Sequence, residues 1–451
     1  MKIIIVGCGR VGYSLAGKLN AENNDVTVVD LSAEKISDVT AQFDVMGVVG
    51  NGATLAVLKE AGIDEADLFI AVTSSDELNL LCCMIAKKEG NCQTVARIKD
   101  PEYSKEAEYL KKQLDLAMVI NPEYEAAKEI ARVLRFPSAM RIEPFGKGRV
   151  ELISFRIGAG NLLIGQSVRD VMGRIRANVQ LATVERGDEA YIVKGDTVFA
   201  EKDVLSFVST PKDAAEFLSK IQHKGYSIKD AMIVGGGIIT HYLCELLEKS
   251  GISLKIIEKN YDVCEELASE WTKLTVINAN PSDHALLKEQ GIEKTDAFVA
   301  LAPLDEENIL LSLFAKEWGV KKLVTKITRI DYDGVVARLD LDTVVCPKNV
   351  TADIILRHVR SAKNTEGNNM ENLYNVVQDE VEAAEFIVKD GSAIIGKPLS
   401  ELDLKNNVLV ASIVRDGVVI LPRGNDSIQA GDSVILVTKD IALSDVEDVL
   451  A

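Results

Sequence analysis

The sequence lacks the features that mark membrane-spanning, secreted and metal-binding proteins. No apolar run approaches the roughly eighteen residues that a membrane-spanning helix needs. No cationic stretch precedes an apolar core at the N-terminus, as it would in a secretory signal. The seven cysteines form no C-x-x-C pair, and no metal-ligand spacing links the four histidines, which are His223, His241, His284 and His358. We therefore expect reduced, mostly buried thiols in a cytoplasmic protein, with neither disulfides nor a zinc site.

Positive charge is scarce as well. The chain has 51 lysines and arginines against 69 acidic residues, which gives a formal charge of −18 and a pI near 4.9. This balance disfavours binding to nucleic acid or to an anionic membrane surface, and we interpret it as a contribution to solubility. The 451 residues predict about three domains. A hydrophobic fraction of 47% and a charged fraction of 27% are typical of globular proteins.

The first thirty residues carry the strongest motif in the chain. An apolar run, residues 3–6, leads directly into a complete G-x-G-x-x-G, followed by a predicted helix over residues 10–20. Gly7 allows the tight turn from strand to helix, Gly9 lets the backbone approach a phosphate, and Gly12 lets helix and strand pack closely. The helix start points N–H groups and a partial positive charge at an anion. The motif is formed by Gly7, Cys8, Gly9, Arg10, Val11 and Gly12.

A second apolar run, residues 26–29, ends on Asp30. An acidic side chain about eighteen residues after the motif suits the paired hydroxyls of a ribose and repels a 2′-phosphate. The combination predicts an adenine-nucleotide site and argues against NADP. It does not separate NAD from ATP, which share the adenosine hydroxyls. A glycine-rich turn in an α/β domain without a ligand is the alternative.

The opening segment continues as alternating apolar strands and helical stretches. Six strands in this rhythm predict a doubly wound parallel sheet with its ligand crevice at the carboxyl ends of the strands. From residue 149 the pattern changes to short strands separated by glycines, with helical signal only near 167–172 and 213–221. We expect a small α+β module there. The fold class is therefore α/β, with two Rossmann-like doubly wound domains that are each followed by a small α+β domain.

The prediction that a large domain and a small domain occur twice rests on an internal repeat. In the second copy, the apolar run of residues 231–234 precedes Gly235-Gly236-Gly237. The acid that corresponds to Asp30 is Glu258. The predicted domains are residues 1–135 and 228–358, which bind nucleotide, and residues 140–224 and 370–451, which are small and regulatory. The polar stretches 144–148 and 361–372 are interpreted as linkers.

Three further groups are expected at strand ends around the first crevice. Asn51 and Gly52 follow the third strand, where they can contact an adenine or ribose edge; a turn capped by Thr54 is the alternative. Thr73 and Ser74 follow the fourth strand and can contact ribose or phosphate. Asp76, at a helix start, is interpreted as an ordinary cap.

Two arginines complete the first crevice. Arg97 ends the fifth strand, where its guanidinium can pair with phosphate, and an exposed structural ion pair is the alternative. Arg10 is a cation at a helix N-terminus, which is locally unfavourable and so suggests a nearby anion.

The second crevice has lost several of these groups. Thr240 replaces the packing glycine, and Ala302-Pro303 replaces the hydroxyls of Thr73-Ser74. Lys326 keeps the charge of Arg97 without its planar fork. Nucleotide binding is still expected there, but weaker or with another specificity. The candidate residues are Gly235, Gly236, Gly237, Ile238, Ile239, Glu258, Ala279 and Asn280.

The missing chemistry favours a sensor over an enzyme. Hydride transfer to a carbonyl needs a positioned acid facing the nicotinamide, and the small modules contain no Ser/Tyr/Lys constellation that could supply one. His241 is expected to face solvent or to pack. No G-x-x-x-x-G-K-[ST] is present, which excludes a P-loop ATPase. We expect no catalytic residues and no metal.

The segments GCGRVG, NGATLAVLKEAGI, AVTSSDELNLLCC and ARIKDPEY resemble the potassium-conductance-regulating (KTN/RCK) nucleotide-binding domain. The small modules resemble that family's C-terminal regulatory domain, and the tandem order resembles the Trk potassium-uptake regulator family (TrkA). The resemblance implies a cytoplasmic peripheral subunit, a homotetrameric ring beneath a potassium-translocating membrane subunit. It also implies that NAD(H), or ATP and ADP at the same crevice, biases the ring.

Carried over by the resemblance, the first site falls on residues 7–11 with Asp30, Asn51, Gly52, Thr73, Ser74 and Arg97. The second falls on residues 235–239 with Glu258, Ala279 and Asn280. Two other functions stay open, a nucleotide-sensing regulator of another transporter and an NAD-dependent oxidoreductase.

Overall fold

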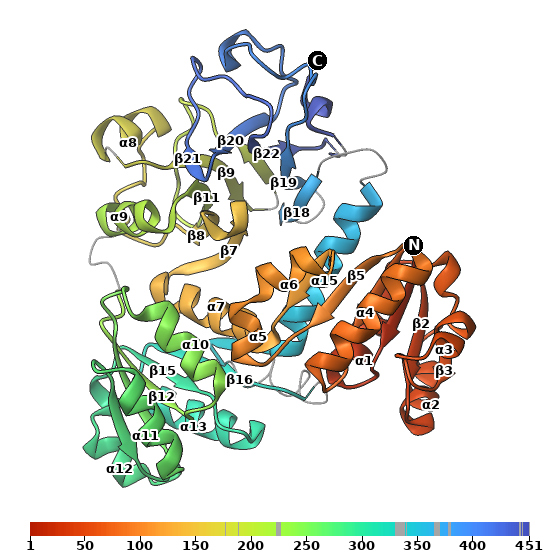
Figure 1. The fold of residues 1–451 in the computed structure, drawn as a ribbon. Coiled ribbons are helices and arrows are strands. Elements are labelled where there is room, and N and C mark those ends of the chain that lie inside the picture. The colour runs from red at the N-terminus through yellow and green to blue at the C-terminus, as the bar shows by residue number, and fades with distance from the viewer. Residues whose placement is uncertain are drawn as a thin grey trace. The chain divides into compact units, whose positions relative to one another are not determined.

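The computed structural model describes all residues except 176, 188, 222–226, 330–338, 340, 365–369, 378–379, 442, 444 and 451. Its chain forms two compact units (Figure 1). The first contains the two large α/β domains, Met1–Leu134 and Ile228–Leu356. The second contains the two small domains, Arg135–Ser227 and Arg357–Ala451. Each unit is described by itself below. His223 lies outside the described residues.

The first α/β domain is a six-stranded parallel sheet in the order β3-β2-β1-β4-β5-β6. This order reverses direction between β1 and β4, which creates the ligand crevice of a doubly wound fold. The strands are β1 (Lys2–Val6), β2 (Asp25–Asp30), β3 (Met46–Val49), β4 (Leu68–Ala71), β5 (Gln93–Arg97) and β6 (Met118–Ile120). The helices are α1 (Arg10–Ala21), α2 (Ala33–Gln42), α3 (Leu55–Glu60), α4 (Asp76–Gly90), α5 (Pro101–Lys105), α6 (Ala107–Gln113) and α7 (Pro122–Arg135).

The second α/β domain repeats this order as β14-β13-β12-β15-β16-β17. Its strands are β12 (Asp230–Val234), β13 (Ser253–Glu258), β14 (Thr275–Asn278), β15 (Ala297–Ala300), β16 (Lys322–Lys326) and β17 (Thr343–Val345). Its described helices are α10 (Ile238–Leu247), α11 (Tyr261–Glu270), α12 (His284–Glu289), α13 (Asp305–Glu317) and α15 (Pro347–Asn364). The predicted pair of doubly wound domains is confirmed.

Both faces of the first sheet are covered, since residues 3–6 of β1 and all four residues of β4 are apolar and buried. Ile4 and Val6 of β1 pack in one core with Leu58 of α3 and with Cys82 and Cys83 of α4. Ile3 and Ile5 alternate with these residues and are equally buried, as expected for a sheet with helices on both sides. This packing fixes the carboxyl ends of the strands as one rigid edge.

The small domains are antiparallel sheets of five strands each, ordered β10-β9-β11-β8-β7 and β18-β19-β22-β20-β21. The first consists of β7 (Ala139–Phe145), β8 (Val150–Arg156), β9 (Gln180–Arg186), β10 (Glu189–Ile192) and β11 (Val204–Ser209), with α8 (Val168–Ile175) and α9 (Pro211–Ile221). The second consists of β18 (Met370–Val377), β19 (Val381–Ile387), β20 (Val408–Arg415), β21 (Val418–Ile420) and β22 (Ser433–Lys439). One apolar core contains residues of both sheets, among them Phe145, Leu152, Ala383 and Val437.

The two α/β domains contact each other through two pairs of helices within their unit. Helix α7 of the first packs on α10 of the second, where Tyr124 meets Tyr242 edge-on and Asn121 donates to the Tyr242 hydroxyl at 3.0 Å. On the other side, Lys18 of α1 pairs with Asp353 of α15. These contacts bring the two crevices to one interface.

The linker predictions differ from the structure. The stretch 144–148 ends β7 and forms the turn into β8, because Pro144 and Phe145 continue the pairing of that hairpin. Residues 361–364 belong to α15 and residues 370–372 to β18; the centre of that predicted linker lies outside the described residues. Among the residues that the structure describes, no helix is long and apolar enough to cross a membrane.

Candidate functional site

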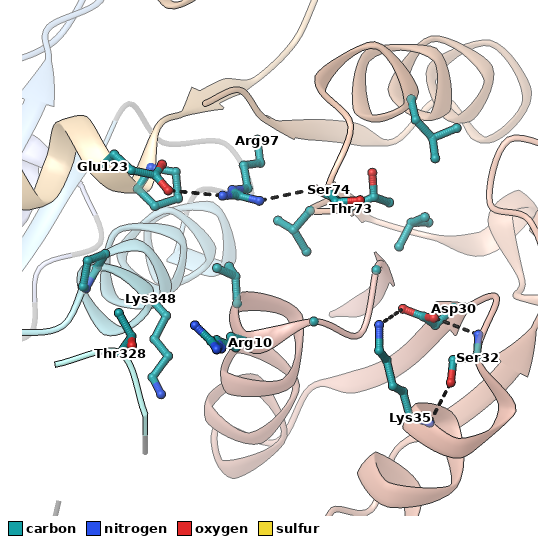
Figure 2. A pocket seen from close by; sticks show the side chains of 18 of the residues that line it. Arg10, Asp30, Ser32, Lys35, Thr73, Ser74, Arg97, Glu123, Thr328 and Lys348 are labelled. Atoms are coloured by element: carbon teal, nitrogen blue, oxygen red, sulfur yellow. Dashed lines mark hydrogen bonds and ion pairs between the residues drawn. The ribbon is translucent and has the colours of Figure 1, made fainter. Parts of the chain in front are cut away.

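A cavity of about 860 Å³ opens at the carboxyl ends of the first sheet's strands. Its volume lies in the range of small-molecule sites. Residues of both α/β domains line it, including Gly9, Asp30 and Arg97 of the first and Gly237 and Lys348 of the second. Figure 2 shows Asp30, Ser32 and Lys35 on one side of the cavity, and Arg10, Thr328 and Lys348 on the other.

The glycines of the turn differ in what requires them. Gly7 has φ +103°, and a Cβ there would lie 2.9 Å from the backbone nitrogen of Thr73. A Cβ on Gly12 would lie 1.9 Å from the carbonyl oxygen of Gly7. A Cβ on Gly9 would meet no protein atom within 4 Å and would project into the cavity. The fold therefore requires Gly7 and Gly12, whereas no protein contact requires glycine at position 9.

Asp30 stabilises the turn as well as facing the cavity. Its carboxylate accepts from the N–H of Cys8 at 2.7 Å and from the N–H of Ser32 at 2.8 Å, and Lys35 Nζ lies 3.9 Å away. A carboxylate has about four acceptor positions, so two backbone bonds leave capacity for ribose hydroxyls. Cys8 itself is buried, and burial raises the pKa of its thiol to about 11.

The loop after β3 has a structural reason for its glycine. A Cβ on Gly52 would lie 2.3 Å from Val6 Cγ1, so packing alone requires glycine there. Asn51 is exposed, and its side-chain oxygen accepts from the N–H of Ala53 at 3.0 Å. Thr54 does not cap α3 with its side chain; its hydroxyl donates to the carbonyl of Asn51 instead. Asn51 lines the cavity together with Gly50 and Gly52.

The loop after β4 is held by Asn79. Its side-chain oxygen accepts from the N–H and the hydroxyl of Thr73, at 2.8 and 2.7 Å. Ser74 is exposed on the cavity wall. The interpretation of Asp76 as a cap is wrong. Ser75 caps α4 by accepting from Leu78 N–H, and the buried Asp76 carboxylate accepts from the N–H groups of residues 99 and 100.

Arg97 is positioned by two oxygens. Its Nη1 donates to the carbonyl of Thr73 at 3.3 Å, and its Nη2 lies 3.4 Å from Glu123 Oε1. Both contacts are long, and its buried Nε has no hydrogen-bond partner. The Arg97 side chain is 16% exposed. A phosphate oxygen would complete its hydrogen bonding.

The opposite wall of the cavity comes from the second α/β domain. Lys326 donates to the carbonyl of Leu301 at 3.2 Å, and burial lowers its pKa although Asp305 and Glu123 are near. Lys348, at the start of α15, is 6% exposed. In Figure 2 the Arg10 side chain points toward Lys348 and Thr328 and away from Asp30.

The second crevice keeps the turn geometry of the first. Glu258 accepts from the N–H of Gly236 and from the N–H of Asn260, both at 2.7 Å, as Asp30 does in the first copy. Gly235 has φ +98°. Thr240 fits the tight position because its hydroxyl donates to the carbonyl of Gly235 at 2.6 Å. The second crevice thus keeps the acid and the turn. It lacks counterparts of the Thr73 and Ser74 hydroxyls, which follow β4 in the first domain.

The cavity gathers most of the predicted residues of the first site. Gly7, Gly9, Arg10, Val11, Asp30, Asn51, Gly52, Thr73, Ser74 and Arg97 line it, whereas Cys8 and Gly12 lie buried behind the turn. Of the second set, only Gly237, Ile238 and Ile239 line it. Gly235, Gly236, Glu258, Ala279 and Asn280 do not.

The cysteines and histidines that the structure describes form no metal cluster. All seven cysteines are free thiols, and six of them are buried. His241 pairs with Glu270, and His284 packs on Phe314. Within the described ranges, no group of three or more His, Cys, Asp or Glu side chains could hold a metal ion.

Comparison with known families decides the class of the protein. The TrkA-N domain model matches residues 3–122 and 231–347, and the TrkA-C domain model matches residues 152–222 and 383–451. The chain belongs to the TrkA family. Each α/β domain is a TrkA-N domain, and the TrkA-C matches cover most strands of each small sheet, without β7 and β18.

Relatives match over the whole chain. The chain is 32% identical to "Trk system potassium uptake protein TrkA homolog 1" of Methanosarcina mazei, covering 99% of both chains. It is 30% identical to "Trk system potassium uptake protein TrkA" of Halomonas elongata, covering 98% of this chain and 96% of that protein.

Two solved structures share the fold. One, titled "GsuK channel bound to NAD", has a TM-score of 0.63 at 18% identity, over 97% of this chain and 77% of that one. The other, titled "Crystal structure of the GsuK bound to ADP", has a TM-score of 0.51 at 13% identity, over 80% and 69%.

Sequence reasoning missed four charged groups of the cavity wall, namely Lys35, Glu123, Lys348 and, as a member of the first site, Lys326. A signal for two of them was present. Pro122-Glu123 and Pro347-Lys348 follow the last strand of each TrkA-N domain, so extending the repeat by one more helix would have found them.

Proposed function

We propose that this chain is the nucleotide-sensing regulatory subunit of a Trk-type potassium uptake system and performs no catalysis. The observation that carries this proposal is the first crevice, where an open glycine turn, Asp30 and Arg97 face one cavity in a TrkA-N domain. The relatives named Trk system potassium uptake protein support the transported ion.

The ligand of the first site is an adenine nucleotide, NAD(H) or ATP/ADP. The N–H groups of residues 9–11 at the start of α1 bind its phosphates, and Asp30 accepts from the ribose hydroxyls. Asn51, Gly52, Thr73, Ser74 and Arg97 surround it. The solved relatives with NAD and with ADP support this class of ligand.

The second TrkA-N domain binds a nucleotide less tightly or with another specificity. Residues 235–239 supply the turn, Glu258 supplies the acid, and Ala279 and Asn280 lie at the end of β14. Asn280 repeats the turn geometry of Asn51, since its side-chain oxygen accepts from the N–H of Ser282 at 3.1 Å. The hydroxyls of Thr73 and Ser74 have no counterpart there, which reduces the hydrogen bonds available to the ligand.

Membership of the TrkA family supports a proposal for assembly and location. The chain forms a homotetrameric ring and binds peripherally at the inner, cytoplasmic face of the membrane, against a potassium-translocating subunit. A bound nucleotide shifts the ring only by its different affinity for two arrangements of paired domains, typically about 1–3 kcal/mol per coupled site.

Replacing Asp30, which we propose binds the ribose, tests whether this carboxylate is needed for ligand binding or only for the structure of the turn. We expect Asp30→Ala to abolish binding of NAD⁺, NADH, ATP and ADP to the first site, measured by calorimetry on the full chain. Glu258→Ala is the matched control, because Glu258 accepts the same two kinds of backbone bond in the second copy. Equal loss of binding in both variants would show that the effect is structural.

The coupling route predicts a phenotype for Arg97. The Arg97 guanidinium contacts both the loop after β4, at Thr73, and Glu123 at the start of α7. A phosphate that binds Arg97 therefore changes the contact between Arg97 and α7. We expect Arg97→Ala to retain the fold and to lose most of the nucleotide dependence of potassium flux. Unchanged nucleotide dependence in this variant would refute the route through Arg97.

A further inference from the structure

Strand β3 (Met46–Val49) is the edge strand of the first TrkA-N sheet and pairs with β2 on its inner side. The N–H of Gly50 donates to the carbonyl of Asp30, and backbone direction alternates along a strand. The N–H and C=O groups of Gly47 and Val49 therefore point away from β2. Natural edge strands are commonly protected by a lysine, a proline or a bulge, and β3 carries none of these. Its outer edge can accept another strand.

Large apolar side chains are exposed on both sides of this edge. Val48 packs in the core with α3, whereas a Cβ on Gly47 would meet Ile36 of α2, so α3 and α2 cover the two faces of β3. Because side chains alternate, Met46 lies on the α3 side and Val49 on the α2 side. Their exposed fractions are 63% and 53%. A helix laid on one side would reach only one of them, whereas an added strand would contact both.

The second TrkA-N domain lacks this apolar edge, although its sheet has the same strand order. The paired registers of β2 with β3 and of β13 with β14 show which positions correspond, and each apolar residue of the first domain has a polar counterpart. The pairs are Met46 and Thr275, Val49 and Asn278, and Leu31 and Lys259. The fold therefore does not need the apolar side chains of the first edge, and a lysine is a usual protection against strand addition.

The exposed charges on α2 and before β3 are mostly acidic. Glu34 and Asp38 of α2 and Asp44 are exposed, and the exposed Lys35 lies 3.9 Å from the carboxylate of Asp30. An apolar edge with an acidic rim fits an extended segment that carries lysine or arginine beside apolar side chains. Cytoplasmic segments of membrane proteins are enriched in these two residues.

We propose that β3 is the docking strand for the membrane subunit. An extended cytoplasmic segment of that subunit, apolar with flanking lysine or arginine, pairs with β3 and adds a strand to the first sheet. This inference rests on the proposed function and names the surface through which the chain acts. Val49 is the sheet partner of Asp30, and Leu31 lines the nucleotide cavity, so the docked segment lies beside the ribose end of the site. Binding at the two sites is therefore coupled.

A lysine on the edge strand tests the docking. We expect Met46→Lys in the full chain to lower the affinity for a purified Trk-type membrane subunit at least about tenfold in biolayer interferometry, because a buried methionine is lost and a lysine blocks the edge. Calorimetric binding of ATP should be unchanged, since Met46 does not line the cavity. Thr275→Lys, at the corresponding position of β14, is the matched control and should change neither affinity. Met46→Thr with Val49→Asn installs the residues of β14 and serves if the first variant fails to fold.

Hydrogen–deuterium exchange tests the strand pairing itself. The amides of Gly47 and Val49 should exchange more slowly in the complex with the membrane subunit than in the free chain. Equal affinity of the wild type and the β3 variants, or unchanged exchange at these amides, would overturn the docking strand and leave nucleotide sensing intact. A changed oligomeric state of the free β3 variants in light scattering would assign the edge to a second copy of the chain and also overturn it. Failure of the wild type to bind the membrane subunit would overturn the proposed function as well.

Discussion

Replacing Gly9 with valine should lower nucleotide affinity at the first crevice at least about a hundredfold while the protein stays folded. The phosphates lose two or more charge-assisted bonds to backbone N–H groups, each contributing about 1.5–3 kcal/mol. The backbone of Gly9 is extended, with φ −78° and ψ −168°, so valine fits without strain. A Cβ there meets no protein atom within 4 Å, so the fold does not resist it. Calorimetric titration with ATP and NAD⁺ measures the loss.

Gly7→Ala is the control for this experiment. Its φ of +103° and the 2.9 Å approach to Thr73 predict strain and an early thermal transition, whether or not a nucleotide is added. Thermal unfolding of both variants separates the two roles of glycine in one motif. Undiminished binding by Gly9→Val would show that the ligand does not contact this turn.

Replacing Asp203 with alanine should destabilise the small domains by about 2–4 kcal/mol, the largest stability effect that we expect from a single side chain. The Asp203 side chain is 1% exposed and accepts two bonds from Arg186, at 2.8 and 2.7 Å, and one from the N–H of Ala200. Arg186 is 46% exposed, so water can solvate its guanidinium once the Asp203 carboxylate is removed. The lower half of the range therefore applies. Calorimetric unfolding of the full chain measures the change.

Asp432 offers a matched comparison in the second small domain. It accepts the same three bonds, from Arg415 and from the N–H of Gln429. Asp432→Ala should therefore cost a similar amount, and the exposed Asp196 should tolerate alanine without loss. Stability of Asp203→Ala equal to that of Asp196→Ala would contradict the account.

The ion pair of Asp203 with Arg186 also predicts that the stability of the protein depends on pH. Burial alone would raise the pKa of Asp203, but the bonds from Arg186 and Ala200 outweigh burial and hold this pKa below its usual range. The unfolded chain then takes up a proton first as pH falls below about 4, so the stabilising contribution is lost from there down through the folded pKa. The difference between wild type and Asp203→Ala should therefore narrow as pH falls.

Local patterns were sufficient to predict the doubly wound fold. Apolar strands such as residues 3–6 and 231–234 are buried on both faces, so their position follows from composition, and the glycine turns follow from spacing. The hairpin strand β7 was missed because Pro144 and the glycines after it are typical of linkers. Pairing with β8 overrides that local signal.

The composition of the cavity wall required the tertiary structure. Lys348 and Glu123 are far apart in the chain and line the same cavity because helices of the two TrkA-N domains pack against each other. The packing role of Gly52 could not be predicted from the sequence either. Gly52, in the loop after β3, lies against Val6 of β1, and the spacing of residues along the chain does not show this contact.

Potassium flux through a Trk-type membrane subunit in proteoliposomes, with this chain added and the nucleotide as the only variable, tests the central claim most directly. The account predicts that flux changes when ATP is exchanged for ADP, or NADH for NAD⁺, and that Asp30→Ala removes this dependence. Flux that is the same with every nucleotide and without any, although the chain is bound to the membrane subunit, would contradict it.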